Sequence, residues 1–104
     1  MIRVLFSPQA EADLEEIGDF IAQDSPLRAL SFVQELRQHA LNIGTTPRAF
    51  RARPELGEGL RGAVRGNYLL FYTHDHDTVR IQRIMHGSRD ITPEDFSDTG
   101  LAPG

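Results

Sequence analysis

The sequence predicts an α+β domain in which a helical hairpin packs on an antiparallel sheet. Two consecutive segments each begin with Ser-Pro and carry apolar residues at helical spacing. Only about two residues connect them, so the two helices must fold back on each other. Residues 60–86 then alternate as strands do and predict a three-stranded antiparallel meander. The joint apolar face of the helices needs a sheet to cover, and the meander supplies one.

The first elements are a short strand and the two helices. Residues 2–6 are mostly apolar and predict a strand. Ser7-Pro8 predicts the start of a helix that runs to about Asp24, because serine caps a helix and proline fits its first turn. Ser25-Pro26 predicts a second helix that ends near Ile43. Their apolar stripes consist of Ala10, Leu14, Ile17 and Ile21 in the first helix, and of Ala29, Phe32, Val33, Leu36, Ala40 and Ile43 in the second.

The polar residues of the helices are interpreted as solvent-facing. An acidic docking face is the alternative for the first helix, but charge runs of this kind are usually solvated. His39 lies off the apolar stripe of the second helix and is expected to be exposed. The acidic residues of the first helix are Glu11, Asp13, Glu15, Glu16 and Asp19.

The meander is predicted from three strands and two turns. The strands are residues 60–65, Tyr68–His74 and Thr78–His86, and Gly66-Asn67 forms the first turn because both residues tolerate positive φ. The middle strand is apolar on both faces, so it should be central. Ile84 breaks the alternation of the last strand, which indicates either a bulge near Gln82-Arg83 or burial on both sides.

The remaining segments predict loops and a tail. Residues 45–59 contain two prolines and two glycines and predict a loop, with Phe50 and Leu56 tucked under it as anchors. Residues 92–95 predict a cap and one helical turn. We expect one domain over residues 1–96 and a flexible C-terminal tail over residues 97–104.

The composition limits the possible classes of protein. There is no cysteine, no apolar run of the roughly 20 residues that a membrane span needs, and no signal peptide. We therefore expect a soluble cytoplasmic protein without a membrane partner. The net charge is −4, but residues 48–89 carry a net charge of +4. This unevenness favours a localised anion or partner site over general nucleic-acid affinity, and the chain alone should not bind DNA sequence-specifically. All eleven basic residues are arginine.

Metal, cofactor and hydrolase chemistry are not predicted. His74, Asp75, His76 and Asp77 are possible ligand types, but they form one polar turn with no other ligand cluster nearby. Ser88 follows His86 by two residues without an acid clearly placed to orient the histidine.

One constellation remains, which consists of Arg61, Arg65, Arg83, His86 and Arg89. Side chains on paired strands can converge on one surface, and two chemistries then fit. The arginines and the histidine can bind an RNA phosphate and protonate a leaving group. Alternatively, the same arginines can bind carboxylates or an apolar-acidic helix of a partner protein.

The order of strand, helical hairpin, basic loop and meander resembles the RelE/ParE toxin superfamily of bacterial type II toxin–antitoxin systems. The resemblance is closer to the ParE branch and covers about residues 1–90. It rests on SPQAEADLEEIGDFIA and SPLRALSFVQEL in the helices, on PELGEGLRGAVRGNYLLFY, and on the ending VRIQRIMHGSRD.

The resemblance implies two mechanisms. ParE-type relatives poison DNA gyrase by binding it, and a ParD-like antitoxin neutralises them; they help to stabilise plasmids by arresting growth. RelE-type relatives cleave mRNA on the ribosome, and Arg61, Arg83 and His86 stand at comparable places. However, this chain has no terminal tyrosine and no lysine. A homologue that only binds its antitoxin is a third reading.

We therefore interpret the chain as a ParE-like toxin without catalytic residues, metal or cofactor. The residues expected to bind the target or the antitoxin are Arg48, Arg51, Arg53, Arg61, Arg65, Tyr68, Tyr72, Arg83, His86 and Arg89.

Overall fold

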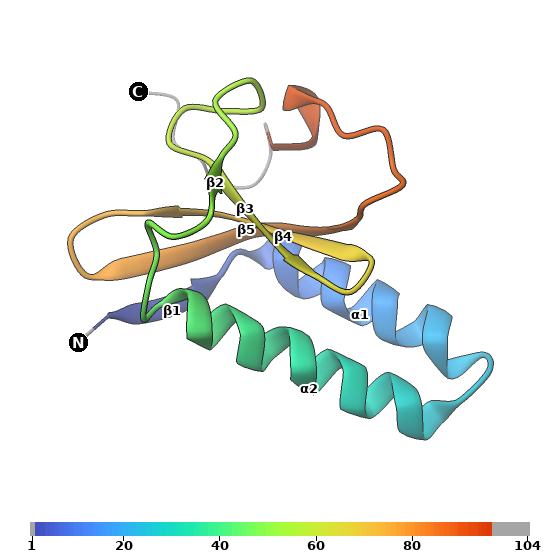
Figure 1. Cartoon of the computed structure of the whole chain (residues 1–104). Coiled ribbons are helices and arrows are strands. Elements are labelled where there is room, and N and C mark those ends of the chain that lie inside the picture. Colours follow the sequence, from blue (N-terminus) through green and yellow to red (C-terminus); the bar gives the residue numbers. More distant parts are fainter. Residues whose placement is uncertain (1, 97–104) are drawn as a thin grey trace.

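The computed structural model describes residues 2–96, which form two layers (Figure 1). A five-stranded sheet forms one layer, and a hairpin of two helices packs on one of its faces. The predicted α+β fold is therefore confirmed. The elements in chain order are β1 (Arg3–Phe6), α1 (Pro8–Ala22), α2 (Pro26–Ile43), β2 (Arg51–Ala52), β3 (Arg61–Arg65), β4 (Tyr68–His74), β5 (Thr78–His86) and the 3₁₀ helix η1 (Pro93–Phe96).

The strand order is β1-β5-β4-β3-β2, so β4 is central, as its two apolar faces predict. The sheet is mixed and not wholly antiparallel, because β1 pairs in parallel with β5. A parallel pair needs a long connection, which here is most of the chain, and no local pattern reveals such a partner. The predicted loop 45–59 also contains β2, whose two residues are too few to show strand alternation.

The meander contains a bulge at Gln82. On β4, Phe71 pairs with Arg83 and its neighbour Tyr72 pairs with Ile81, which leaves Gln82 as the extra residue of β5. Both predictions for this strand are correct, because residues 81–85 are also all buried. The bulge lets Ile81 and Ile84 pack on the same face of the sheet.

Each helix begins at a serine cap. The side chain of Ser7 accepts a hydrogen bond from the Ala10 backbone N–H at 3.0 Å, and Ser25 does the same for Arg28 at 3.1 Å. Helix α1 ends at Ala22, two residues before the expected end. Gly44 follows α2, and a Cβ there would lie 2.8 Å from Cγ2 of Val4. Glycine therefore allows the end of α2 to approach β1.

Two apolar clusters lie on opposite faces of the sheet. The larger lies between the sheet and the helical hairpin and includes Leu14, Leu36 and Tyr72. The smaller lies on the far face, where the 53–60 loop and η1 cover the strands. The smaller cluster consists of Leu56, Leu60, Phe71, Met85 and Phe96.

His39 is half-buried, which corrects the expectation that it is exposed. The chain after α2 folds back over this side of the helix, and Phe50 packs edge-on to the imidazole with 6.1 Å between ring centroids. Nε2 of His39 is buried and has no hydrogen-bond partner among residues 2–96. Burial, reinforced by the charge of Arg65, lowers the pKa of His39.

The predicted tail over residues 97–104 lies outside the described residues. Between residues 2 and 96, neither helix is long and apolar enough to cross a lipid bilayer.

Candidate functional site

Arg83 is a buried structural residue in this fold. It is only 8% exposed, and its Nε and Nη2 donate to the two carboxylate oxygens of Asp13 at 2.7 and 2.9 Å. Its Nη1 donates to the backbone carbonyl of Asp95 at 2.8 Å. Asp13 also accepts the backbone N–H of Ile84 at 3.0 Å. The hydrogen bonds to Asp13 raise the pKa of Arg83. Together the four bonds join α1, β5 and η1.

Tyr72 is also inside the protein. It is fully buried, and its hydroxyl donates to the backbone carbonyl of Pro47. Burial raises its pKa to about 12. The sequence places Tyr72 and Arg83 among the partner-binding residues, but neither offers its side chain at the surface of this fold.

Arg61, Arg83 and His86 do not converge. Paired residues of an antiparallel sheet share a face, so Arg61 lies on the helix-side face with Tyr72, whereas Arg83 lies on the far face with Phe71. His86 pairs with Tyr68, four residues along β4 from the partner of Arg61, which is about 13 Å of strand. The guanidinium of Arg61 donates to the Phe50 carbonyl at 2.7 Å.

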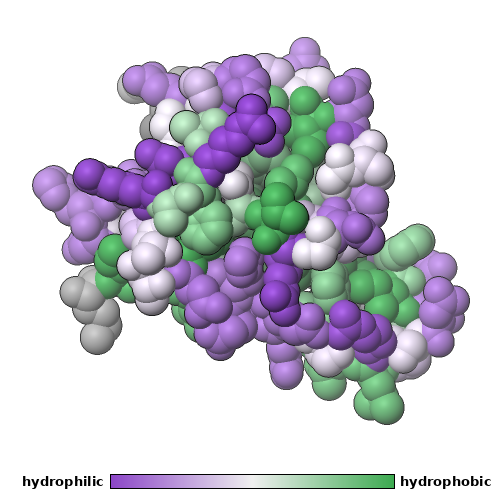
Figure 2. Space-filling view, in the orientation of Figure 1, coloured by the Kyte–Doolittle hydropathy of each residue, from purple (hydrophilic) through white to green (hydrophobic). Residues whose placement is uncertain are grey.

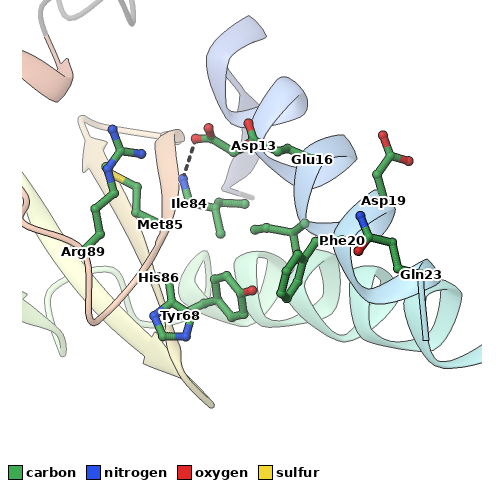
Figure 3. A pocket seen from close by; sticks show the side chains of 11 residues that line it. Asp13, Glu16, Asp19, Phe20, Gln23, Tyr68, Ile84, Met85, His86 and Arg89 are labelled. Atoms are coloured by element: carbon green, nitrogen blue, oxygen red, sulfur yellow. Dashed lines mark hydrogen bonds between the residues drawn. The ribbon is translucent and has the colours of Figure 1, made fainter. Parts of the chain in front are cut away.

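His86 instead meets two other predicted residues, Tyr68 and Arg89. Tyr68, His86 and Arg89 lie on one wall of a cavity of 440 Å³ between α1 and the end of the β4–β5 pair (Figure 3). We call this cavity the α1 cleft. Its lining consists of Asp13, Glu16, Ile17, Asp19, Phe20 and Gln23 from α1, and Tyr68, Ile84, Met85, His86 and Arg89 from the sheet and the segment that follows.

The polar groups of the sheet-side wall are held in place. The rings of Tyr68 and His86 meet edge to face, with 5.1 Å between centroids. Nδ1 of His86 accepts the backbone N–H of Ser88 at 3.1 Å, so in the neutral ring Nε2 carries the proton. Arg89 donates to Asp95 at 3.0 Å. Burial raises the pKa of Tyr68, so its hydroxyl is protonated at neutral pH and is not a base.

The sequence indicates a solvated face for the acidic residues of α1, with a docking face only as the alternative. Glu16 and Asp19 lie one turn apart on α1, as residues at i and i+3 do. Neither side chain forms a hydrogen bond or ion pair with another residue in the described part of the chain. The sequence does carry a signal for Asp13, because it falls within the i, i+3, i+4 spacing of Ala10 and Leu14 and so points toward the interior.

The other predicted arginines lie toward the β2 and β3 edge of the sheet, away from the α1 cleft. Arg51 is on the edge strand β2 and, like Arg48 in the preceding loop, is exposed, and neither side chain forms a hydrogen bond or ion pair within residues 2–96. Arg53 pairs with Glu55 at 2.7 Å, and its guanidinium carbon lies 5.8 Å from the centroid of the Phe71 ring. Arg65 donates to Glu35 at 3.3 Å.

This basic region contains an open strand edge. Strand β2 pairs only with Arg61 and Gly62, so the outer side of β3 beyond Gly62 has no neighbouring strand among the described residues. Val64 is 64% exposed there. We call Arg51 and Arg65, with the outer side of β3, the β2–β3 edge. Arg48 lies in the loop before this edge, where it lines a pocket with Ile2, His74 and His76.

The polar turn between β4 and β5 is open to solvent, with Asp75, His76 and Asp77 exposed. Over residues 2–96, the structure contains no group of three or more His, Asp or Glu side chains placed to hold a metal ion.

The fold, a helical hairpin on a mixed five-stranded sheet, is like that of RelE/ParE toxins. The chain belongs to the ParE toxin family of type II toxin–antitoxin systems, whose family model (ParE toxin of type II toxin-antitoxin system, parDE) matches residues 4–91. The chain is similar to toxin ParE1 of two Mycobacterium tuberculosis strains. Each is 35% identical over 92 residues, which cover 86% of this chain and 93% of the relative.

Two solved structures are similar in fold. A chain of the chromosomal ParDE system from P. aeruginosa has a TM-score of 0.69 and 22% identity, over 83% of this chain and 96% of the other. A chain of the RelBE2 toxin–antitoxin complex from Mycobacterium tuberculosis has a TM-score of 0.62 and 29% identity, over 82% of this chain and 96% of the other.

Proposed function

We propose that this toxin binds and inhibits DNA gyrase in the cytoplasm, without chemistry of its own, and that a cognate ParD-like antitoxin neutralises it. Growth arrest and plasmid stabilisation follow from such an activity. The observation that supports this proposal is the buried pair of Asp13 and Arg83, because it removes one of the three residues on which RNA cleavage would depend.

RNA cleavage by 2′-hydroxyl attack needs a base, an acid and stabilisation of the phosphate, all at one place. Arg83 is buried on the far face, and Arg61 is held by the Phe50 carbonyl away from His86. Arginine is a poor base because its pKa exceeds about 12. His86 therefore lies apart from Arg61 and Arg83. Beside it are Tyr68, whose raised pKa makes it a poor base, and Arg89, whose guanidinium is bound to Asp95. Binding a protein requires less, because apolar and aromatic surface with charged groups at its rim suffices.

The β2–β3 edge supports an antitoxin partner. A disordered acidic and apolar tail can add a strand to the open side of β3 while its carboxylates meet Arg48, Arg51 and Arg65. We infer that a helical part of the same tail contacts the hairpin. Co-expression with the antitoxin gene should yield a complex that co-purifies, and separate elution at moderate salt would contradict the antitoxin proposal.

The gyrase proposal is tested with the purified protein in a supercoiling assay. Inhibition is expected, and His86→Gln should reduce it less than it would reduce a nuclease activity, because His86 would act as a contact and not in proton transfer. In cells, expression without antitoxin should produce filaments and trapped gyrase–DNA complexes while mRNA stays intact. Normal supercoiling at saturating toxin would refute gyrase as the target.

A RelE-like mRNA endonuclease is the second candidate, and the likeness to the RelBE2 complex favours it. Codon-specific cuts in translated mRNA that His86→Gln abolishes, with folding unchanged, would establish this candidate instead. A protein with neither activity that still binds its antitoxin would be the third reading.

A further inference from the structure

We propose that the α1 cleft receives an arginine side chain of the target protein. The inference rests on the proposed function in taking this cleft as the target-binding surface, and it names the chemistry of the residue that enters.

The floor of the cleft is apolar and aromatic and is partly open to water. Figure 3 shows Tyr68 extending from β4 toward α1, where Phe20 projects from the helix. Phe20 is 66% exposed, and Figure 2 shows apolar side chains gathering near the end of the hairpin. A ligand that covers these rings removes apolar area from water, which is favourable. Aromatic faces also attract a cation that lies over them.

The unpaired charge of the cleft is negative. Asp13 is neutralised by Arg83, and Arg89 is bound to Asp95 on its own segment. Glu16 and Asp19 remain on the opposite wall, where no ion pair within residues 2–96 neutralises them. A cation entering the cleft would meet two carboxylates on one side and ring faces beneath, whereas an acidic antitoxin tail would be repelled. The cleft and the β2–β3 edge therefore suit partners of opposite charge.

Arginine fits this arrangement better than lysine does. Its planar guanidinium can stack on an aromatic ring while its edge donates hydrogen bonds to two carboxylates at once. Lysine presents a compact, strongly hydrated charge that cannot do both. The cleft volume of 440 Å³ lies in the range of small ligand sites, which suits one long side chain and its backbone.

The test is an NMR titration of the full chain with N-acetyl-L-arginine amide, read at the methyl groups of Met85 and Ile84. N-acetyl-L-citrulline amide is the control ligand, because it has nearly the same shape without the charge. Glu16→Gln is the test variant and Glu15→Gln its matched control, because both remove one exposed carboxylate from adjacent positions of α1.

Saturable shifts with the arginine amide are expected. The affinity should fall roughly three- to fivefold in Glu16→Gln and stay unchanged in Glu15→Gln. The inference would be overturned if the citrulline amide gave equal shifts or if no saturable shift appeared. It would also be overturned if both variants lost affinity equally. Failure of the supercoiling assay while the arginine amide still binds would refute the gyrase proposal and leave the cleft chemistry supported.

Discussion

Asp13 and Arg83 show how one ion pair can hold three segments. β1 separates from β5 after Ile81, and α1 then covers the exposed edge of β5. Asp13 provides the acceptor that the Ile84 N–H needs, and it neutralises the arginine beside it. Arg83 in turn fixes the backbone of η1 through Asp95.

Arg83→Ala should therefore lower the free energy of unfolding by about 3 kcal/mol or more, because it leaves a buried carboxylate without its counter-ion. Urea unfolding at pH 7 measures this. Arg80→Ala, on the same strand but exposed, is the control and should stay within about 0.5 kcal/mol of the parent. If Arg83→Ala loses toxicity, we expect the cause to be unfolding. A variant as stable as the parent would contradict the structural role of Arg83.

His39 should make stability depend on pH. Because the pKa of His39 is lowered in the folded state, the unfolded chain takes up a proton on this residue first as the pH falls below about 6.5. Acidification to pH 5.5 should therefore reduce stability more in the parent than in His39→Gln, which carries no titrating group there. Urea unfolding of both proteins at pH 7.5 and 5.5 provides the comparison, and an equal loss in the two would refute this role.

At the scale of elements, Ser7 and Ser25 both cap a helix, but only the side chain of Ser7 also bonds to another element within residues 2–96. Both cap a helix that begins with proline, as the sequence predicts. Ser7 also donates its hydroxyl hydrogen to the Gln82 carbonyl at 2.7 Å, next to the bulge. It therefore links the start of α1 to β5.

The two serines form a matched pair for measurement. Ser25→Ala should cost about 1 kcal/mol for the lost cap, and Ser7→Ala about 2 kcal/mol, because it also loses the bond to Gln82. Thermal or urea unfolding of the two variants tests this difference. Equal losses would show that the bond to Gln82 contributes nothing to stability.

Local signals predicted most of the elements and little of the site. The Ser-Pro caps, the apolar stripes and the Gly66-Asn67 turn each act within a few residues, so the bounds of α2, β4 and β5 agree with the prediction. The burial of Arg83 depends on an aspartate 70 residues away, and no local pattern reports such a pairing. Exposure of Tyr72 was misjudged for the same reason, because the loop that covers it comes from a distant part of the chain.

At the scale of the whole molecule, charge is divided between two surfaces. The β2–β3 edge is basic, whereas the α1 wall of the cleft is acidic. Such a division steers different partners to different sides and acts mainly on association rates. The two surfaces also differ in shape, because one is an open strand edge and the other is a cavity.

The double change Arg48→Gln/Arg51→Gln should slow association with the antitoxin by about tenfold at low salt, and less at high salt. Arg3→Gln/Arg80→Gln is the control. It removes the same charge from exposed residues at the other edge of the sheet, on β1 and β5. Stopped-flow mixing measures both rates, and equal slowing by the two double changes would show that only net charge matters.

The parallel pair of β1 and β5 affects how the toxin is made. Ser7, just after β1, bonds to a residue 75 positions later in the chain. Because β1 has no strand partner until residues 78–81 are synthesised, the nascent chain cannot complete its sheet during most of translation, and contacts of this separation form slowly. The folded surface that would bind a target therefore arises only after β5 has been synthesised. If the proposed neutralisation holds, an antitoxin already present in the cell has until then to reach the toxin before the toxin can act.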